Sequence, residues 1–258
     1  MYNTPAMPTP VMHLALAEEI LCGGDLAPAV RRALAQQRGP FLLGHTAPDI
    51  QTISRQGREE THFYTIPRTS DRPAYEALFA AHPRLARAEA LPPAQAAFMA
   101  GYIAHLLLDV VWLEDIFLRY FMMQEWGPLG ERLFLHNVLR TWVDARDQQR
   151  LNGDVAAALS EVEPWGWLPF VGDEHLRTWR DWLVQQLGPA RSVETAQVFA
   201  RRMGVPAAEV EEILASPQQM EERIFCHVPQ TVLQSFHDVG YERSVALISW
   251  YVGKYAHS

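Results

Sequence analysis

The stretch between Pro93 and Pro128 contains no internal proline, and its first two thirds are almost continuously apolar, as in the run AAFMAGYIAHLLLDVVW. A helix that is apolar on nearly every face has to be buried on every face. Alternating runs of valine, isoleucine and threonine, which predict strands, are almost lacking. The 258 residues, 48% of them hydrophobic, allow a sizeable core. We therefore expect an all-α protein, with one multi-helix domain over residues 1–258 around a long buried central helix.

Prolines and glycines divide the rest of the chain into segments with helical periodicity. The expected helices cover 10–22, 27–37, 72–81, 93–125, 129–151, 154–162, 174–187, 193–202, 206–215, 220–235 and 241–255. The segment 41–64, which contains Gly44, Pro48 and Gly57, is expected to be irregular.

Charge and cysteine content narrow the class of protein. The formal net charge is −8, whereas a general nucleic-acid binder normally presents a basic face, so no nucleic-acid partner is expected. Cys22 and Cys226 form no CxxC pair, which argues against a disulfide framework and a thiolate zinc site. The first residues lack the basic segment of a signal peptide. A membrane span with a carboxylate in its middle is unfavourable in free energy. We expect a cytoplasmic protein.

The central helix carries the first chemical signal, in the segment HLLLD. His105 and Asp109 are four residues apart and share one helix face. An ionised carboxylate in these apolar surroundings costs several kcal/mol, about 3 or more, unless it is paired or coordinated. A shared metal ion would satisfy both groups. A buried histidine–aspartate hydrogen bond, or a pair with a distant arginine, is the alternative that spacing alone leaves open.

Three further residues are candidate ligands at other places in the chain. Asp49 follows Pro48 and could equally be a helix-capping or turn residue. His62 lies in THFY and could instead be a half-buried polar loop residue. His13 lies in the apolar segment PVMHLALA and could instead be a histidine of the core. Two imidazoles and two carboxylates would suit a hydrolytic zinc site, although iron or manganese accept similar ligands. His45 is a candidate for an outer contact to such ligands.

The order of these short motifs resembles the zinc-dependent phospholipase C family. His13 comes first, GHTAPD follows and ends in Asp49, THFY contains His62, and HLLLD contains His105 and Asp109. The match covers about residues 8–118, under half of the chain.

The resemblance implies a fold, a cofactor and an activity. The family is all-α and binds three zinc ions in a cleft that accepts a phosphodiester. Asp49, His62, His105 and Asp109 would form the first zinc site. Asp109 would also bridge to a second ion held by His13, and Asp49 would help to activate the attacking water.

Other positions depart from the family's pattern. Its secreted members use an N-terminal tryptophan as a ligand, whereas this sequence begins Met1-Tyr2. Asp115 stands ten residues after His105, where the family has a histidine, and carboxylate oxygen also binds zinc. His136 is the histidine of the following segment, with Arg140 where the family has a glutamate. Asp115 and His136 complete the expected ligand set, for one to three Zn²⁺ ions.

The expected function is that of a zinc-dependent hydrolase, phospholipase C-like, which cleaves a small-molecule or lipid phosphodiester with an activated water. Peripheral membrane contact is left open, as is the oligomeric state. The alternative is a non-catalytic helical scaffold or binding protein that retains one structural metal site. A nuclease-like activity is a third hypothesis, which the net charge of −8 disfavours.

Overall fold

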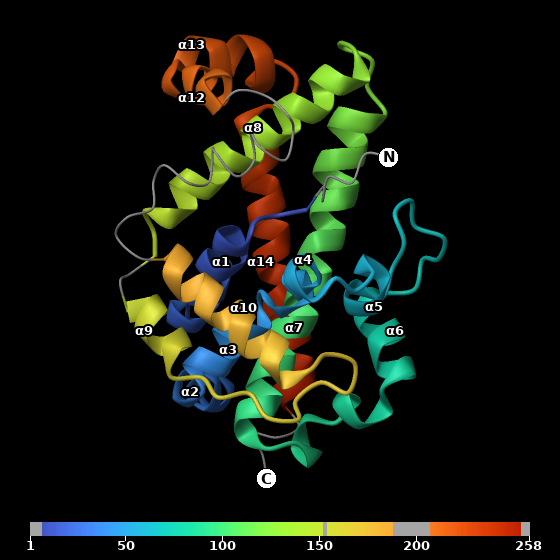
Figure 1. Ribbon diagram of the computed structural model, residues 1–258, viewed down its shortest axis with the longest axis vertical. Coiled ribbons are helices and arrows are strands. Elements are labelled where there is room, and N and C mark those ends of the chain that lie inside the picture. Colours follow the sequence, from blue (N-terminus) through green and yellow to red (C-terminus); the bar gives the residue numbers. More distant parts are fainter. Residues whose placement is uncertain (1–6, 152–153, 188–206, 254–258) are drawn as a thin grey trace. The chain divides into compact units, whose positions relative to one another are not determined.

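The computed structural model describes residues 7–151, 154–187 and 207–253, and every regular element in them is helical (Figure 1). The predicted all-α class is therefore confirmed. The predicted central helix is present as α7 (Pro93–Trp112), which continues directly into the π-helical segment η4 (Leu113–Met122).

This continuous helix is buried, as its composition requires. The segment from Pro93 to Met122 is long and apolar enough to cross a membrane, but 89% of its most apolar window is covered by protein. Burial of this extent is typical of the core helix of a soluble protein, and the remaining described residues contain no other helix of such length and composition.

The chain folds into two compact units. The unit that carries most of the candidate ligands comprises residues 13–108, 151–188 and 241–258. Besides α7, its elements are α1 (Pro10–Cys22), α2 (Pro28–Gln36), α3 (Arg38–Gly44), η1 (Ala47–Ile50), α4 (Gln51–Ser54), α5 (Arg58–His62), α6 (Ala74–Ala81), η2 (Pro83–Ala86), η3 (Ala88–Ala90), α9 (Asp154–Ser160), α10 (Asp173–Gln186) and the end of α14 (Gln230–Gly253).

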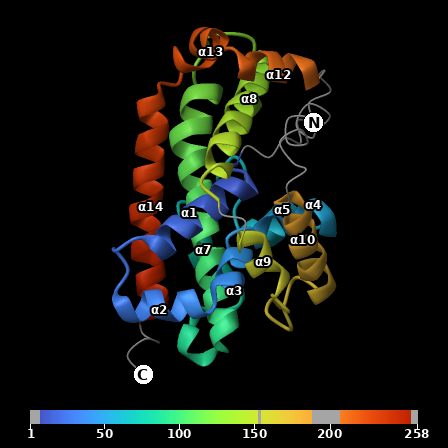
Figure 2. The ribbon, with the colours of Figure 1, turned by 90° about the vertical axis from the view of Figure 1, so that its left-hand side faces the viewer.

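Short helices in this unit are held by packing and by a few polar contacts. Helix α9 packs against both α3 and α10, which lie on either side of it (Figure 2). Arg38, at the start of α3, donates to Glu18 at 2.8 Å and to Asp154 at 3.2 Å, so it ties α1 and α9 to α3. The Trp179 indole of α10 donates to Thr46 Oγ1 at 3.2 Å, which anchors the turn before η1.

The other unit comprises residues 1–12, 109–150 and 189–240. Its described elements are the last turn of α7, η4, α8 (Leu129–Gln148), α12 (Ala207–Ala215), α13 (Pro217–Met220), η5 (Glu221–Phe225) and the first part of α14. Helix α8 contacts η4, α12 and η5. This division does not test the expectation of one domain over residues 1–258, which stays a prediction.

Three local expectations were wrong or fall outside the described residues. Segment 41–64 is not irregular but forms a series of short helices, because Pro40 lies in the first turn of α3, where a missing N–H costs nothing. Residues 220–235 do not form one helix, since Pro229 separates η5 from α14, and α14 runs through Gly240, where a break was expected. One glycine inside a helix costs only about 1 kcal/mol, which tertiary packing overrides, and Gly240 is buried. The helix expected at 193–202 lies outside the described residues.

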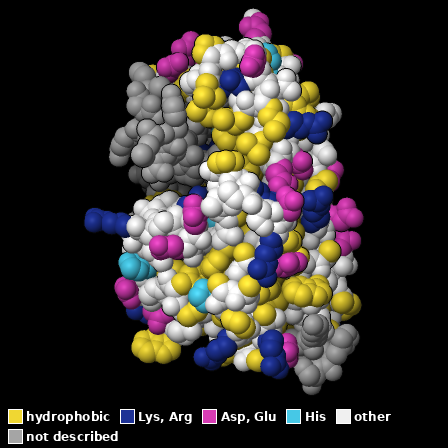
Figure 3. All heavy atoms as spheres, turned by 90° about the vertical axis from the view of Figure 1, so that its right-hand side faces the viewer, with side chains coloured by type: hydrophobic (Ala, Val, Ile, Leu, Met, Phe, Trp, Pro, Cys, Tyr) yellow, Lys and Arg dark blue, Asp and Glu magenta, His cyan; other side chains and the backbone are white. Residues whose placement is uncertain are grey.

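The surface carries both signs of charge. On the face shown in Figure 3, basic and acidic side chains are interspersed and alternate with apolar ones. Although the net charge is −8, the acidic side chains on this face do not form one continuous patch.

Candidate metal centre

Two glycines allow α3 and α7 to cross at backbone contact. A Cβ on Gly44 would fall on the carbonyl oxygen of Phe98, far inside van der Waals contact. A Cβ on Gly101 would fall against the Phe41 carbonyl and within 2.8 Å of the His45 amide nitrogen. Only glycine permits backbones to approach so closely, and the crossing sets the end of α3 beside the middle of α7.

This crossing orients His105. Its Nδ1 lies 2.8 Å from the backbone oxygen of His45. A carbonyl oxygen can only accept, so Nδ1 carries the proton and the lone pair of the ring lies on Nε2. Such a hydrogen bond is the usual way in which a protein fixes the tautomer of a metal-binding histidine. His105 is fully buried and therefore offers Nε2 to the interior.

His62 is oriented in the same way from α5. Its Nδ1 lies 3.2 Å from the carbonyl oxygen of Arg58, one turn earlier, and 3.0 Å from Thr61 Oγ1. Its Nε2 lies 3.6 Å from Oδ1 of Asp49, in η1. Asp49, His62 and His105 form a group whose potential ligand atoms all lie within 4.8 Å of one another. We call these three residues the loop group.

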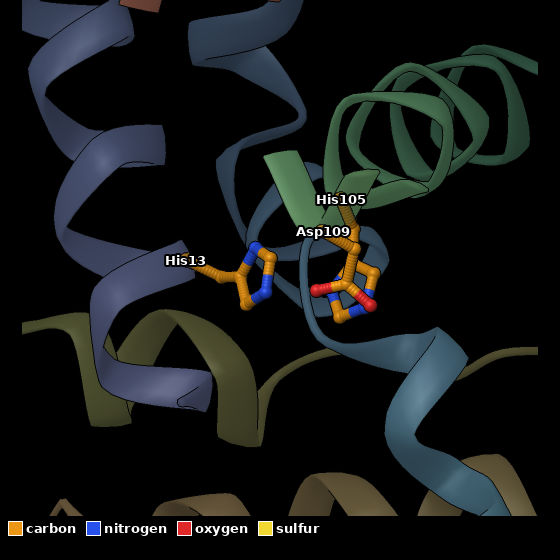
Figure 4. Close-up of side chains that lie close together, drawn as sticks. All are labelled: His13, His105 and Asp109. Atoms are coloured by element: carbon orange, nitrogen blue, oxygen red, sulfur yellow. The ribbon is translucent and has the colours of Figure 1, made fainter. Parts of the chain in front are cut away.

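A second group shares His105. The His13 ring stacks on the His105 ring, with centroids 3.8 Å apart and planes inclined by 16°. Asp109 lies one turn beyond His105 in α7, so helix geometry places its carboxylate on the same face. Figure 4 shows the His13 ring, carried by α1, turned toward the His105 ring and the Asp109 carboxylate. Potential ligand atoms of His13, His105 and Asp109 also lie within 4.8 Å of one another, and we call these residues the helix group.

The structure thus brings together five of the seven residues that the sequence predicted as ligands. Four of them, His13, His62, His105 and Asp109, are fully buried, and the side chain of Asp49 is 13% exposed. Imidazole nitrogen and carboxylate oxygen at this spacing are a donor set that suits Zn²⁺, and also Fe or Mn. The residues present therefore fit a divalent cation, because a bound cation would offset the charge of an ionised carboxylate in a buried site.

Tyr102 supports the loop group and was missed in the sequence. Its buried hydroxyl donates to the backbone oxygen of Thr61 at 2.6 Å, which holds the residue before His62. Burial, followed by the negative charge of Asp49, raises the pKa of Tyr102 well above its usual value, so the hydroxyl remains a donor. Tyr102 precedes His105 by three residues and shares its face, which is the signal that could have identified it.

We expect the Tyr102→Phe variant to lose about 1 kcal/mol of unfolding free energy, the usual net contribution of one buried hydrogen bond. Its zinc affinity should also fall, because the carbonyl of Thr61 no longer holds His62 in place. Tyr251→Phe is the matched control, since the Tyr251 hydroxyl donates to the Leu85 carbonyl at 2.7 Å and is also buried. Urea unfolding and competition with a zinc chelator measure the two effects. Equal zinc affinities in both variants would show that Tyr102 only stabilises the fold.

Asp115 and His136 are not part of either donor group. The carboxylate of Asp115 is exposed on η4. The buried His136 ring accepts a hydrogen bond at Nε2 from the Trp112 indole at 3.1 Å and contacts Phe117 and Phe121. Burial, and then the charge of Arg140, lowers the pKa of His136 well below its usual value. An apolar cage with one hydrogen bond is typical of a core histidine, although its role as a ligand is a prediction that these contacts do not test.

The His136→Ala variant should therefore keep its metal and lose stability. The cavity and the Trp112 N–H left without an acceptor should together cost roughly 2–4 kcal/mol. Zinc content by mass spectrometry and urea unfolding would check this, with His175→Ala as the control because that side chain is 40% exposed. A loss of one zinc ion per chain would instead establish His136 as a ligand.

The two donor groups are built from residues that four separate elements contribute, namely α1, η1, α5 and α7. The function proposed below is inferred from these two groups. In comparisons with protein-family models, with curated proteins and with solved structures, the chain matches none.

Proposed function

We propose that this chain is a metal-dependent hydrolase, phospholipase C-like, which cleaves a small-molecule or lipid phosphodiester with a water molecule activated at zinc. The order of motifs around His13, Asp49, His62, His105 and Asp109 supports the family, and the two buried donor groups support the metal. A cytoplasmic location belongs to the same proposal.

The partial exposure of Asp49 is the observation that favours a catalytic metal site over a purely structural one. Its side chain is 13% exposed, while the His62 side chain beside it is fully buried. A catalytic metal site keeps a position open for water or substrate, whereas a structural site is closed by four protein ligands. Asp49 is thus the member of the loop group through which water would reach a bound cation.

The residues of the loop group suit this chemistry. Bound Zn²⁺ would supply a Lewis acid for the phosphate oxygens and lower the pKa of a coordinated water to near ~7. The Asp49 carboxylate would accept a hydrogen bond from the attacking water and orient it, and could take its proton. His62 and His105, each fixed through Nδ1, hold their Nε2 lone pairs in place for the cation. A cation would also supply the positive charge that an anionic substrate needs in a chain of net charge −8.

A structural metal site without catalysis is the second candidate. The complete burial of His13, His62, His105 and Asp109 favours it, since the ligands of a structural ion close its site to water. In that case the chain would be a helical scaffold or binding protein.

The experiment compares metal content with hydrolysis on the same preparation. Protein purified without chelator is analysed for metals by inductively coupled plasma mass spectrometry, then assayed on bis(p-nitrophenyl) phosphate and on p-nitrophenylphosphorylcholine. We expect bound zinc, and hydrolysis that a chelator abolishes and Zn²⁺ restores. Zinc without hydrolysis of either ester would favour the structural site. Protein that takes up no metal after Zn²⁺ is offered would overturn both candidates.

A further inference from the structure

The turn that joins η4 to α8 carries a cluster of apolar side chains on its surface (Figure 1). The described part of the chain exposes six large hydrophobic side chains, and three of them lie within residues 122–129. Met123 is 75% exposed, Met122 39% and Leu129 38%, and Trp126 between them is half-buried. Single exposed apolar residues are common on proteins, whereas several on one turn indicate a surface that meets an apolar partner.

The backbone of this turn finds its hydrogen-bond donors within the protein. The last carbonyls of a helix have no partner inside that helix and often bond to water. The guanidinium of the buried Arg132 donates to three carbonyl oxygens of the turn, those of Phe121, Met122 and Gln124. The Trp126 indole donates to a fourth, the carbonyl of Tyr120, at 2.7 Å. These carbonyls can therefore enter an apolar medium without losing a hydrogen bond, which lipid requires of a backbone.

Trp126 also fixes the turn against the rest of its unit. Its ring stacks on the His227 ring, with centroids 4.2 Å apart and planes inclined by 8°. The N–H of Met123 donates to the carbonyl of Leu118 at 2.8 Å and ends η4. The turn is thus held at several points, and its two methionines and Leu129 are exposed by a fixed backbone.

The charges of the turn argue against an anionic partner. From residue 120 to residue 131 the sequence contains Glu125 and Glu131 but neither lysine nor arginine. Both glutamates are exposed, and Arg223 lies 3.5 Å from Glu131 and offsets one of the two charges. Anionic lipid surfaces attract clusters of basic residues, which this turn lacks. A zwitterionic surface, whose net charge is zero, suits the turn better.

The size of the cluster argues against a protein partner. A stable interface between proteins uses about 20–30 residues on each side, whereas this cluster belongs to a single turn. A lipid surface needs no matching shape, because its molecules rearrange around an inserted side chain. Tryptophan favours the boundary between lipid and water, where its ring is apolar and its N–H is polar.

We propose that the η4–α8 turn docks the protein on a zwitterionic phospholipid surface, with Met122, Met123 and Leu129 entering the acyl-chain boundary and Trp126 lying at the level of the headgroups. The inference needs no bound metal and goes beyond the proposed hydrolysis, for which membrane contact was left open. Burial of apolar surface drives the docking, so salt should not weaken it.

The test is cosedimentation of the full chain with vesicles of phosphatidylcholine, and with vesicles that also contain phosphatidylserine. We expect wild type to bind phosphatidylcholine, with no gain from phosphatidylserine and no loss in high salt. Met123→Ser should bind roughly tenfold more weakly, because one apolar side chain no longer leaves water, and the double variant with Leu129→Ser more weakly still. Trp165→Ser is the matched control, since Trp165 is 80% exposed on the loop before α10 and should not affect binding.

The replaced side chains are exposed, so circular dichroism and urea unfolding should show folded variants of wild-type stability. Wild type that does not bind phosphatidylcholine, or Met123→Ser that binds as well as wild type, would overturn the inference. Dimers in wild type that Met123→Ser dissociates, without vesicle binding, would instead assign the turn to contact between copies. Hydrolysis of the soluble bis(p-nitrophenyl) phosphate should be unchanged in Met123→Ser, and vesicle binding unchanged in His105→Ala, so the failure of either proposal leaves the other standing.

Discussion

The His105→Ala variant is expected to lose both bound zinc and phosphodiester hydrolysis. His105 is the one residue that belongs to the loop group and to the helix group, so its removal deprives both of a donor. Loss of an outer contact to a metal ligand lowers metal affinity about 10–100-fold, and loss of the ligand itself should exceed the upper figure. Hydrolysis should fall to the background of the uncatalysed reaction. The zinc content of the purified variant and its rate on bis(p-nitrophenyl) phosphate measure the two effects.

Stability has to be measured on the same protein, because His105 is buried and donates to the His45 carbonyl at 2.8 Å. We expect a loss of roughly 1–3 kcal/mol, so circular dichroism should show a folded variant. His105→Gln, which keeps much of the volume, separates loss of the ligand from the cavity. His175→Ala controls for the removal of a partly exposed histidine. Wild-type zinc content and hydrolysis in folded His105→Ala would refute the proposed function.

The Gly44→Ala variant should show a large loss of unfolding free energy. The new methyl group would fall on the carbonyl of Phe98 in α7, and backbone cannot move aside as a flexible side chain can. Overpacking of a core commonly costs about 1–3 kcal/mol, and a clash of backbone with Cβ places this variant at roughly 3 kcal/mol or more. The shift between α3 and α7 would also draw the His45 carbonyl away from His105 and weaken zinc binding.

Gly130→Ala is the matched control. Gly130 is an exposed helical glycine in the first turn of α8, and an added Cβ would meet nothing within 4 Å. There, alanine should be neutral or stabilising by up to about 1 kcal/mol, because it restricts the unfolded chain and favours the helix. Urea unfolding compares the two substitutions. A Gly44→Ala protein as stable as the Gly130→Ala protein would show that α3 and α7 do not depend on backbone contact.

The sequence determined the helical class and the local part of the site. The proline-free apolar run after Pro93 predicted the buried helix α7 because no exposed helix can be apolar on every face. The spacing of His105 and Asp109 predicted a shared face, which follows from the helical repeat alone. Residues 41–64 were expected to be irregular, because Gly44, Pro48 and Gly57 indicate turns. They form a series of short helices instead.

Tertiary structure decided which distant side chains meet. Asp49, His62 and His13 lie close to His105 only in the folded chain. The crossing of α3 and α7 at Gly44 and Gly101 likewise depends on long-range packing that no local pattern encodes. The hydrogen bonds that select the tautomers of His62 and His105 end on backbone carbonyls, which every residue carries and no motif distinguishes. Spacing along the chain likewise does not show what surrounds His136, whose role as a ligand stays a prediction. Its contacts with Trp112, Phe117 and Phe121 arise only once η4 and α8 have packed together.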